Sequence, residues 1–225
     1  LKPGRIPIDV ILIIVSVIAA IAAMQVAGGL DFMVHIAERI LRRNPRHVTL
    51  LAPMVTYIMT LLAGTGHTAF STLPVIAEVA KEQGIRPSRP LSIAVVASQI
   101  AITASPISAA VVFMSGALEP LGVGYLTLLA ICIPTTFVAC MLTALLCNHL
   151  GVELAQDPVY QDRLAKGLVT LRGETRMQIL PGAKKSVAIF LAAIIAVVLY
   201  ATLISDKVGL IQNPVLPRNE AIMVF

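Results

Sequence analysis

The fold is decided by residues 48–82, which read VTLLAPMVTYIMTLLAGTGHTAFSTLPVIAEVAKE. Two apolar arms, residues 49–62 and 69–80, flank a polar centre, GTGHT, at residues 64–68. An α-helix of about 12 to 14 residues is only about 18–21 Å long, whereas the hydrocarbon core of a bilayer is about 30 Å thick. Neither arm is therefore expected to cross a membrane by itself.

Basic residues lie on both sides of this stretch. Residues 39–46, 81–89 and 163–185 hold four, three and six of the 17 Lys and Arg residues. Basic loops usually stay on the cytoplasmic side, so a single crossing by residues 48–80 would put two of these loops on opposite sides. We therefore predict a re-entrant helical hairpin over residues 49–80. Its polar tip would lie inside the membrane, where it must be buried in protein or line a water-filled cavity.

The composition points to a multispan membrane protein. The 225 residues are 57% hydrophobic and 13% charged, with a mean hydropathy of +0.89, which excludes an ordinary soluble domain. The net charge of +5 is assigned to the basic loops, so no nucleic-acid partner is predicted. No His, Cys, Asp or Glu cluster has metal-ligand spacing, and we predict neither a metal nor a cofactor.

We predict an all-α polytopic membrane protein with one transmembrane domain over residues 1–225. Full spans are predicted over residues 6–26, 91–116, 125–146 and 187–204. The amphipathic loop 31–47 is expected along the cytoplasmic interface, residues 151–186 form a cytoplasmic loop, and residues 205–219 form an external loop. The chain lacks an initiator Met and ends in an apolar run, so we expect it to be a fragment of a longer polypeptide.

A substrate site is predicted where the hairpin tip meets a break in the span 91–116. The second arm begins near residues 67–70, where unpaired N–H groups and the helix dipole favour an anion. Pro106 removes a backbone donor, so the span is expected to break at residues 103–106. This break offers donors near residues 107–109 and some free carbonyls. Two helix N-termini at mid-membrane would hold the two ends of a dicarboxylate, as in secondary transporters with discontinuous helices. The candidate substrate-binding residues are Gly64, Thr65, Gly66, His67, Thr68, Ser71, Gln99, Thr103, Ser105 and Pro106.

Several of these residues have alternative interpretations. His67 is a candidate proton carrier or pH sensor, although a histidine that satisfies a hydrogen bond of the tip is the commoner case. His67 and Ser71 are four residues apart, as a base and a nucleophile would be, but no orienting acid lies nearby. We therefore predict no catalytic residues. Gln99 is expected to bond between helices and is close enough to the break to contact a substrate.

The same residues carry a resemblance to a known family. The segments AMQVAGGLDFMVHIAERILRRNPRH (23–47), LAGTGHTAFSTLPVIAEVAKEQGIRPSRPLS (62–92) and QIAITASPISAAVV (99–112) resemble the Dcu family of anaerobic C4-dicarboxylate transporters. DPVYQDRLAKGLVTLRGE (157–174) and PGAKKSV (181–187) resemble the cytoplasmic loop of that family. The resemblance covers essentially the whole chain and is strongest for the A-type branch, which handles aspartate and fumarate.

The resemblance implies a secondary transporter of the bacterial inner membrane in cells growing without oxygen. The implied substrates are fumarate, succinate, malate and aspartate, moved by exchange or by uptake coupled to a cation, H⁺ or Na⁺. The family is built from two inverted repeats, each with a re-entrant hairpin and a broken helix. Residues 64–68 match the tip and residues 103–106 the break, so this chain would be the first half. The alternatives are a membrane-embedded dicarboxylate sensor or scaffold with a sensor-kinase partner, and a channel.

Overall fold

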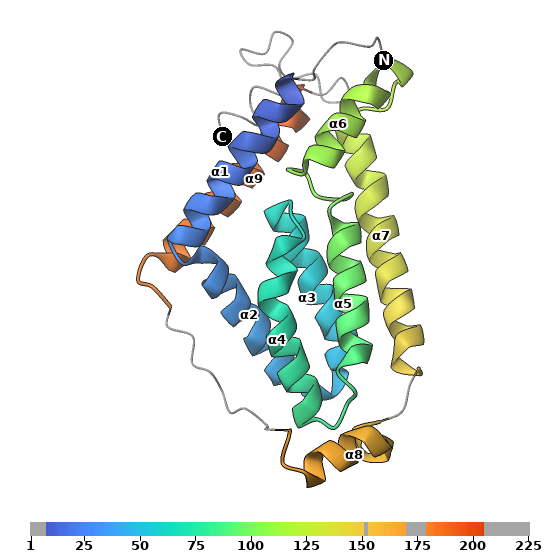
Figure 1. Cartoon of the computed structure of the whole chain (residues 1–225). Coiled ribbons are helices and arrows are strands. Elements are labelled where there is room, and N and C mark those ends of the chain that lie inside the picture. The colour runs from blue at the N-terminus through green and yellow to red at the C-terminus, as the bar shows by residue number, and fades with distance from the viewer. Residues whose placement is uncertain (1–7, 151–152, 170–178, 205–225) are drawn as a thin grey trace.

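The computed structural model describes residues 8–150, 153–169 and 179–204, and the described part is helical and contains no strand (Figure 1). The helices are α1 (Ile8–Val26), α2 (Gly29–Arg43), α3 (Val48–Ala63), α4 (His67–Glu82), α5 (Ser88–Ala101), α6 (Ala109–Leu118), α7 (Tyr125–Asn148), α8 (Pro158–Ala165) and α9 (Ala183–Ile204). In this part of the chain three helical segments are long and apolar enough to cross a membrane, Pro45–Ala63, Tyr125–Asn148 and Ala183–Leu203. The predicted all-helical class with several candidate spans is confirmed.

Helices α3 and α4 form a helical hairpin with a tight turn between them. Gly64 ends α3 with a left-handed φ of 70°, and its N–H donates to the Thr60 carbonyl at 2.8 Å. The predicted arm length is wrong, because each helix has 16 residues, or about 24 Å. The prediction counted apolar residues only, whereas the polar ends are also helical. With the preceding 3₁₀ turn, the segment Pro45–Ala63 has 19 residues and qualifies by length as a span, contrary to the prediction for this arm.

Helix α3 packs closely against α5 because the facing side chains are small. Ala52 and Thr56 of α3 and Ala94 and Ala97 of α5 are all fully buried. Small residues let two helix backbones approach closely, and here the Thr56 hydroxyl donates to the Ala94 carbonyl at 2.8 Å. This contact holds the first arm of the hairpin against the helix that leads to the break.

Replacing Thr56 with valine is expected to destabilise this helix pair by about 1 kcal/mol, since an interhelical hydrogen bond inside a membrane contributes about that amount. The measurement is the thermal unfolding midpoint of the full-length protein in detergent. Thr143→Val is the matched control, because the exposed Thr143 hydroxyl bonds only to the Ala139 carbonyl of its own helix. Equal midpoints for the two variants would contradict the role given to Thr56.

The predicted interruption of the segment 91–116 is confirmed. Helix α5 ends at Ala101 and α6 begins at Ala109, with turns between them. The Ser108 hydroxyl accepts the Val111 N–H at 3.2 Å and donates to the Ile102 carbonyl at 2.6 Å. A serine at this place caps a helix N-terminus, so the chain restarts as a helix directly after Ser108.

The first part of the chain differs from the expectation in two ways. The first helix ends at Val26, as predicted, and Gly28 follows with a left-handed φ of 77°. Most of the predicted loop 31–47 is helical, because α2 runs to Arg43 and buries Met33, Val34 and Leu41. Helix α2 packs against α4 and α9. By length and composition, α1 qualifies as a span only together with α2, from which it is bent by 72°.

The end of the chain also departs from the expected boundaries. The predicted loop 151–186 contains the short helix α8, and α9 begins at Ala183, four residues before the predicted start of the last span. The predicted external loop 205–219 lies outside the described residues, as do residues 6 and 7 of the first span.

Candidate functional site

The hairpin tip and the break between α5 and α6 are in direct contact. The Ser105 hydroxyl donates to the Leu61 carbonyl at 2.7 Å. A Cβ added at Gly64 would lie 2.8 Å from Cγ1 of Ile107, and one added at Gly66 would lie 2.6 Å from Nε2 of Gln99. Figure 1 shows the tip of α3 and α4 at the level of the connection between α5 and α6. Two segments about 40 residues apart in the sequence are thus in direct contact.

Threonine hydroxyls stabilise the hairpin tip by hydrogen bonds within the hairpin. Thr68 is fully buried, and its hydroxyl donates to the Thr65 carbonyl at 3.1 Å and lies 3.3 Å from the Thr60 hydroxyl. The Thr60 hydroxyl is one that the sequence analysis missed. Its spacing of four residues from Thr56 within an apolar arm is the sequence signal of a polar stripe on one face of that arm.

The start of α4 is only weakly capped. The N-cap residue is Gly66, which has no side chain to offer, and the His67 N–H reaches the Thr65 hydroxyl at 3.4 Å. This distance is long for an N–H···O bond. A carboxylate oxygen at this helix end would make shorter, charge-assisted bonds, so this helix end is suited to an anion.

The backbone N–H groups after the break are less available to a ligand than predicted. The donors were expected near residues 107–109, but α6 begins at Ala109 and Ser108 already caps its Val111 N–H. Two carbonyls of the break are also engaged, because that of Ile102 accepts the Ser108 hydroxyl and that of Pro106 accepts the Tyr125 hydroxyl. The break therefore satisfies most of its polar groups internally.

Helix α7 fixes both halves of the site from one side. The Tyr57 hydroxyl of α3 lies 2.8 Å from the Thr136 hydroxyl and donates to the Ile133 carbonyl at 3.1 Å. The Tyr57 ring also meets the Phe137 ring edge to face, with centroids 5.3 Å apart. Tyr125, the first residue of α7, donates to the Pro106 carbonyl of the break. The tip and the break are thus held against a common helix.

The ten candidate residues differ in their access to a solute. Gly66, Thr68 and Ser105 are buried, Gly64, Thr65, Ser71 and Pro106 are half-buried, and His67, Gln99 and Thr103 are exposed. The buried residues hold the tip and the break in position. The exposed imidazole, amide and hydroxyl are the groups that a solute can touch. Among the described residues no group of three or more His, Cys, Asp or Glu side chains could hold a metal ion.

The chain matches known proteins along its whole length. A family model described as an anaerobic C4-dicarboxylate membrane transporter matches residues 1–225. The chain is 75% identical over 225 residues to the C4-dicarboxylate transporter DcuA of Wolinella succinogenes and 55% identical over 225 residues to DcuA of Escherichia coli K12, covering 52% of each relative. It is 54% identical over 226 residues to DcuA of Helicobacter pylori 26695, covering 51% of that relative. The chain thus spans about half the length of the curated relatives it matches. No solved structure matches it.

Proposed function

Since the chain belongs to the family of anaerobic C4-dicarboxylate membrane transporters, we propose that the full-length protein is a secondary transporter of C4-dicarboxylates in the bacterial inner membrane. The substrates are fumarate, succinate, malate and aspartate, carried by exchange or by uptake coupled to H⁺ or Na⁺. The transported acid binds where the hairpin tip contacts the break. The observation that supports this site is the contact of Gly66 with Gln99, which places exposed polar groups beside a weakly capped helix end.

One carboxylate of the substrate binds at the start of α4. The free backbone dipole of this end attracts the negative charge, and His67 and Gln99 lie beside Gly66 to donate hydrogen bonds. The exposed Thr103 hydroxyl, four residues after Gln99, donates to the Ile100 carbonyl at 2.7 Å, and it would turn from this carbonyl to donate to the other carboxylate. The Ser105 bond to the Leu61 carbonyl couples the two elements, so the tip and the break move together during alternating access.

The hairpin is re-entrant in this proposal. Figure 1 shows the end of α2, the start of α3, the end of α4, the start of α5 and helix α8 at one end of the molecule. The basic segments 39–46 and 81–89 adjoin these elements, and α8 carries Arg163, so a cytoplasmic location for this end obeys the charge rule for these basic residues. The chain then supplies the first half of an inverted-repeat transporter, which agrees with its coverage of 52% of its relatives.

The test is uptake of labelled fumarate by vesicles that carry the full-length protein, preloaded or not with succinate. Uptake that saturates and is stimulated by internal succinate is expected of an exchanger. Uptake driven only by an imposed H⁺ or Na⁺ gradient would indicate cation coupling, and uptake that does not saturate would indicate a channel. No uptake under any condition would contradict the proposal and favour the dicarboxylate sensor or scaffold with a sensor-kinase partner.

Thr68→Val is expected to lower fumarate uptake about tenfold without changing membrane insertion. Valine has nearly the shape of threonine, but the loss of the buried hydroxyl removes the bond to the Thr65 carbonyl at the tip, and a lost buried bond costs about 1–3 kcal/mol. The initial uptake rate is measured at equal protein abundance. Thr72→Val is the control, since the equally buried Thr72 hydroxyl bonds only to the Ala69 carbonyl of its own helix. Equal uptake by both variants would argue against the role of Thr68.

A further inference from the structure

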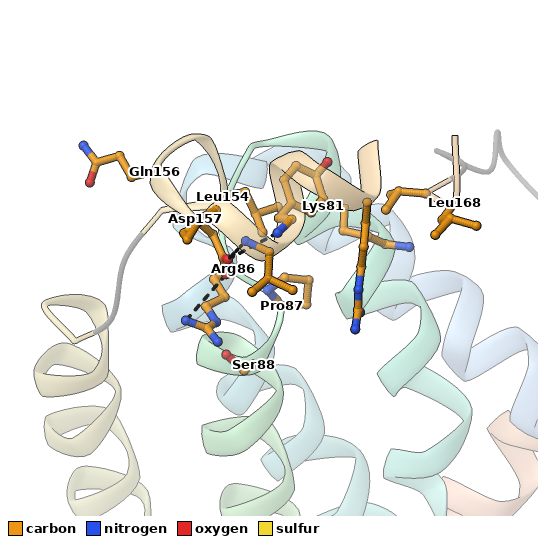
Figure 2. Close-up of a pocket in the computed structure, with 13 residues that line it drawn as sticks. Lys81, Arg86, Pro87, Ser88, Leu154, Gln156, Asp157 and Leu168 are labelled. Carbon is orange, nitrogen blue, oxygen red and sulfur yellow. Dashed lines mark hydrogen bonds and ion pairs between the residues drawn. The ribbon is translucent and has the colours of Figure 1, made fainter. Parts of the chain in front are cut away.

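A pocket lies at the opposite end of the hairpin from the tip. It has a volume of about 930 Å³ and lies between the segment that joins α4 to α5 and the segment that contains α8 (Figure 2). The Leu154 N–H donates to the Gly84 carbonyl at 3.1 Å, and Arg89 pairs with Glu153 at 2.7 Å. These bonds fix α8 against the hairpin and give the pocket two walls.

The charges that line this pocket are mainly positive. Lys81, Arg86 and Arg163 line it, against Asp157 as the one carboxylate among the lining residues. Figure 2 shows Arg86 and Asp157 turned toward each other, and their charged atoms are 3.7 Å apart. The Arg86 side chain is still 47% exposed. The pocket thus keeps an excess of positive charge that is accessible from outside.

Apolar side chains lie beside these cations. Val159 and Leu168 line the pocket and are 58% and 71% exposed. Helix α7 has 24 residues, or about 36 Å, which is longer than the roughly 30 Å hydrocarbon core. A helix of this length that crosses a membrane extends beyond the core into the headgroup region, which is where the end of α7 at Asn148 would lie. Helix α8 begins ten residues later, at Pro158, and lies at the same end of the molecule as the end of α7 (Figure 1).

We propose that this pocket binds an anionic phospholipid, with the headgroup phosphate on Lys81, Arg86 and Arg163 and an acyl chain against Val159 and Leu168. Basic pockets at the cytoplasmic ends of membrane helices are suited to anionic headgroups. The exposed apolar residues beside the cations favour a lipid over a soluble phosphate, which has no apolar part to bury. The bound lipid would join α8 to the loop between α4 and α5.

The test uses native mass spectrometry of the full-length protein in detergent, with phosphatidylglycerol and phosphatidylethanolamine of the same chain length as probes. The wild type is expected to retain phosphatidylglycerol preferentially. Each cation near the membrane surface contributes a factor of about five in lipid affinity. The double variant Arg86→Gln/Arg163→Gln is therefore expected to bind phosphatidylglycerol about 30-fold less well. The matched control is Lys166→Gln, because Lys166 pairs with Asp162 at 2.6 Å and does not line the pocket.

The variant Asp157→Asn tests the site by a gain of lipid binding, which a loss of folding could not produce. Asp157 accepts the Val159 and Tyr160 N–H groups as the N-cap of α8, and asparagine caps equally well. The substitution removes only the carboxylate that competes with the phosphate for Arg86. It is expected to strengthen phosphatidylglycerol binding about two- to fivefold, in line with the contribution of an exposed ion pair.

Weaker binding in the double variant together with tighter binding in Asp157→Asn supports the lipid site. Binding of phosphatidylglycerol that is unchanged in all variants would overturn it. Displacement of the lipid by millimolar inorganic phosphate would also overturn it and would assign the pocket to a soluble anion.

Discussion

Gly64→Ala is expected to reduce C4-dicarboxylate uptake by the full-length protein at least about 30-fold. Gly64 has a φ of 70°, a conformation that costs an L-residue with a side chain about 1–2 kcal/mol. Its new Cβ would also lie 2.8 Å from Ile107, a side chain that is only 5% exposed. Forcing an extra carbon into a packed contact costs about 1–3 kcal/mol more. The tip must therefore move away from the break.

Gly84→Ala is a matched control for this variant. Gly84 has the same φ of 70°, but a Cβ added there meets nothing within 4 Å. Both variants carry the backbone strain, and only Gly64→Ala carries the clash with the break. The measurement is the initial rate of labelled-fumarate uptake at equal protein abundance. A similar loss of uptake in both variants would show that backbone strain alone, and not the contact between tip and break, limits transport.

Ser105→Leu is expected to abolish uptake while membrane insertion stays normal. Ser105 is fully buried, and its hydroxyl donates to the Leu61 carbonyl. Leucine removes this bond and adds three carbons at the point where the break touches the first arm. Ser105→Ala loses only the bond, so it is expected to cost about 1 kcal/mol of stability and to retain part of the uptake.

Uptake and the thermal unfolding midpoint of the Ser105 variants are measured together. The control is Ser92→Leu, because Ser92 is exposed on α5 and its hydroxyl bonds to the Ser88 carbonyl of the same helix. Uptake at the wild-type rate by Ser105→Leu would contradict the close contact of the tip with the break.

The hairpin and the break could be predicted from sequence because both depend on local signals. Two apolar arms around a Gly-Thr-Gly centre predict a helical hairpin, and Pro106 within a polar stretch predicts an interrupted helix. The meeting of the tip and the break was predicted too, but the residues that make the contact could not be derived in this way. The contact depends on how closely α3 approaches α5, which is set by the small residues Ala52 and Ala94 on helices far apart in the sequence.

The helix boundaries were predicted less well because hydropathy alone was used. Charged residues such as Lys81 and Glu82 end the apolar run but continue α4. In the same way α2 looks polar enough for a loop, yet it buries Met33 and Leu41 on one face. The hydrogen-bond partners of Ser105 and Ser108 could not be predicted from the sequence either, since a hydroxyl in a break can bind either a solute or a carbonyl of the protein. Here both bind carbonyls.

The most direct test of the proposed substrate site is protection of a cysteine at position 99. In a full-length protein whose native cysteines are replaced, Gln99→Cys is labelled with a hydrophilic thiol reagent, with and without fumarate. Ser92→Cys, two turns earlier on the same exposed face of α5, is the control. We predict that fumarate slows labelling at position 99 and leaves position 92 unchanged. Equal labelling rates at position 99 with and without fumarate, in protein that still transports fumarate, would contradict a substrate site at the hairpin tip.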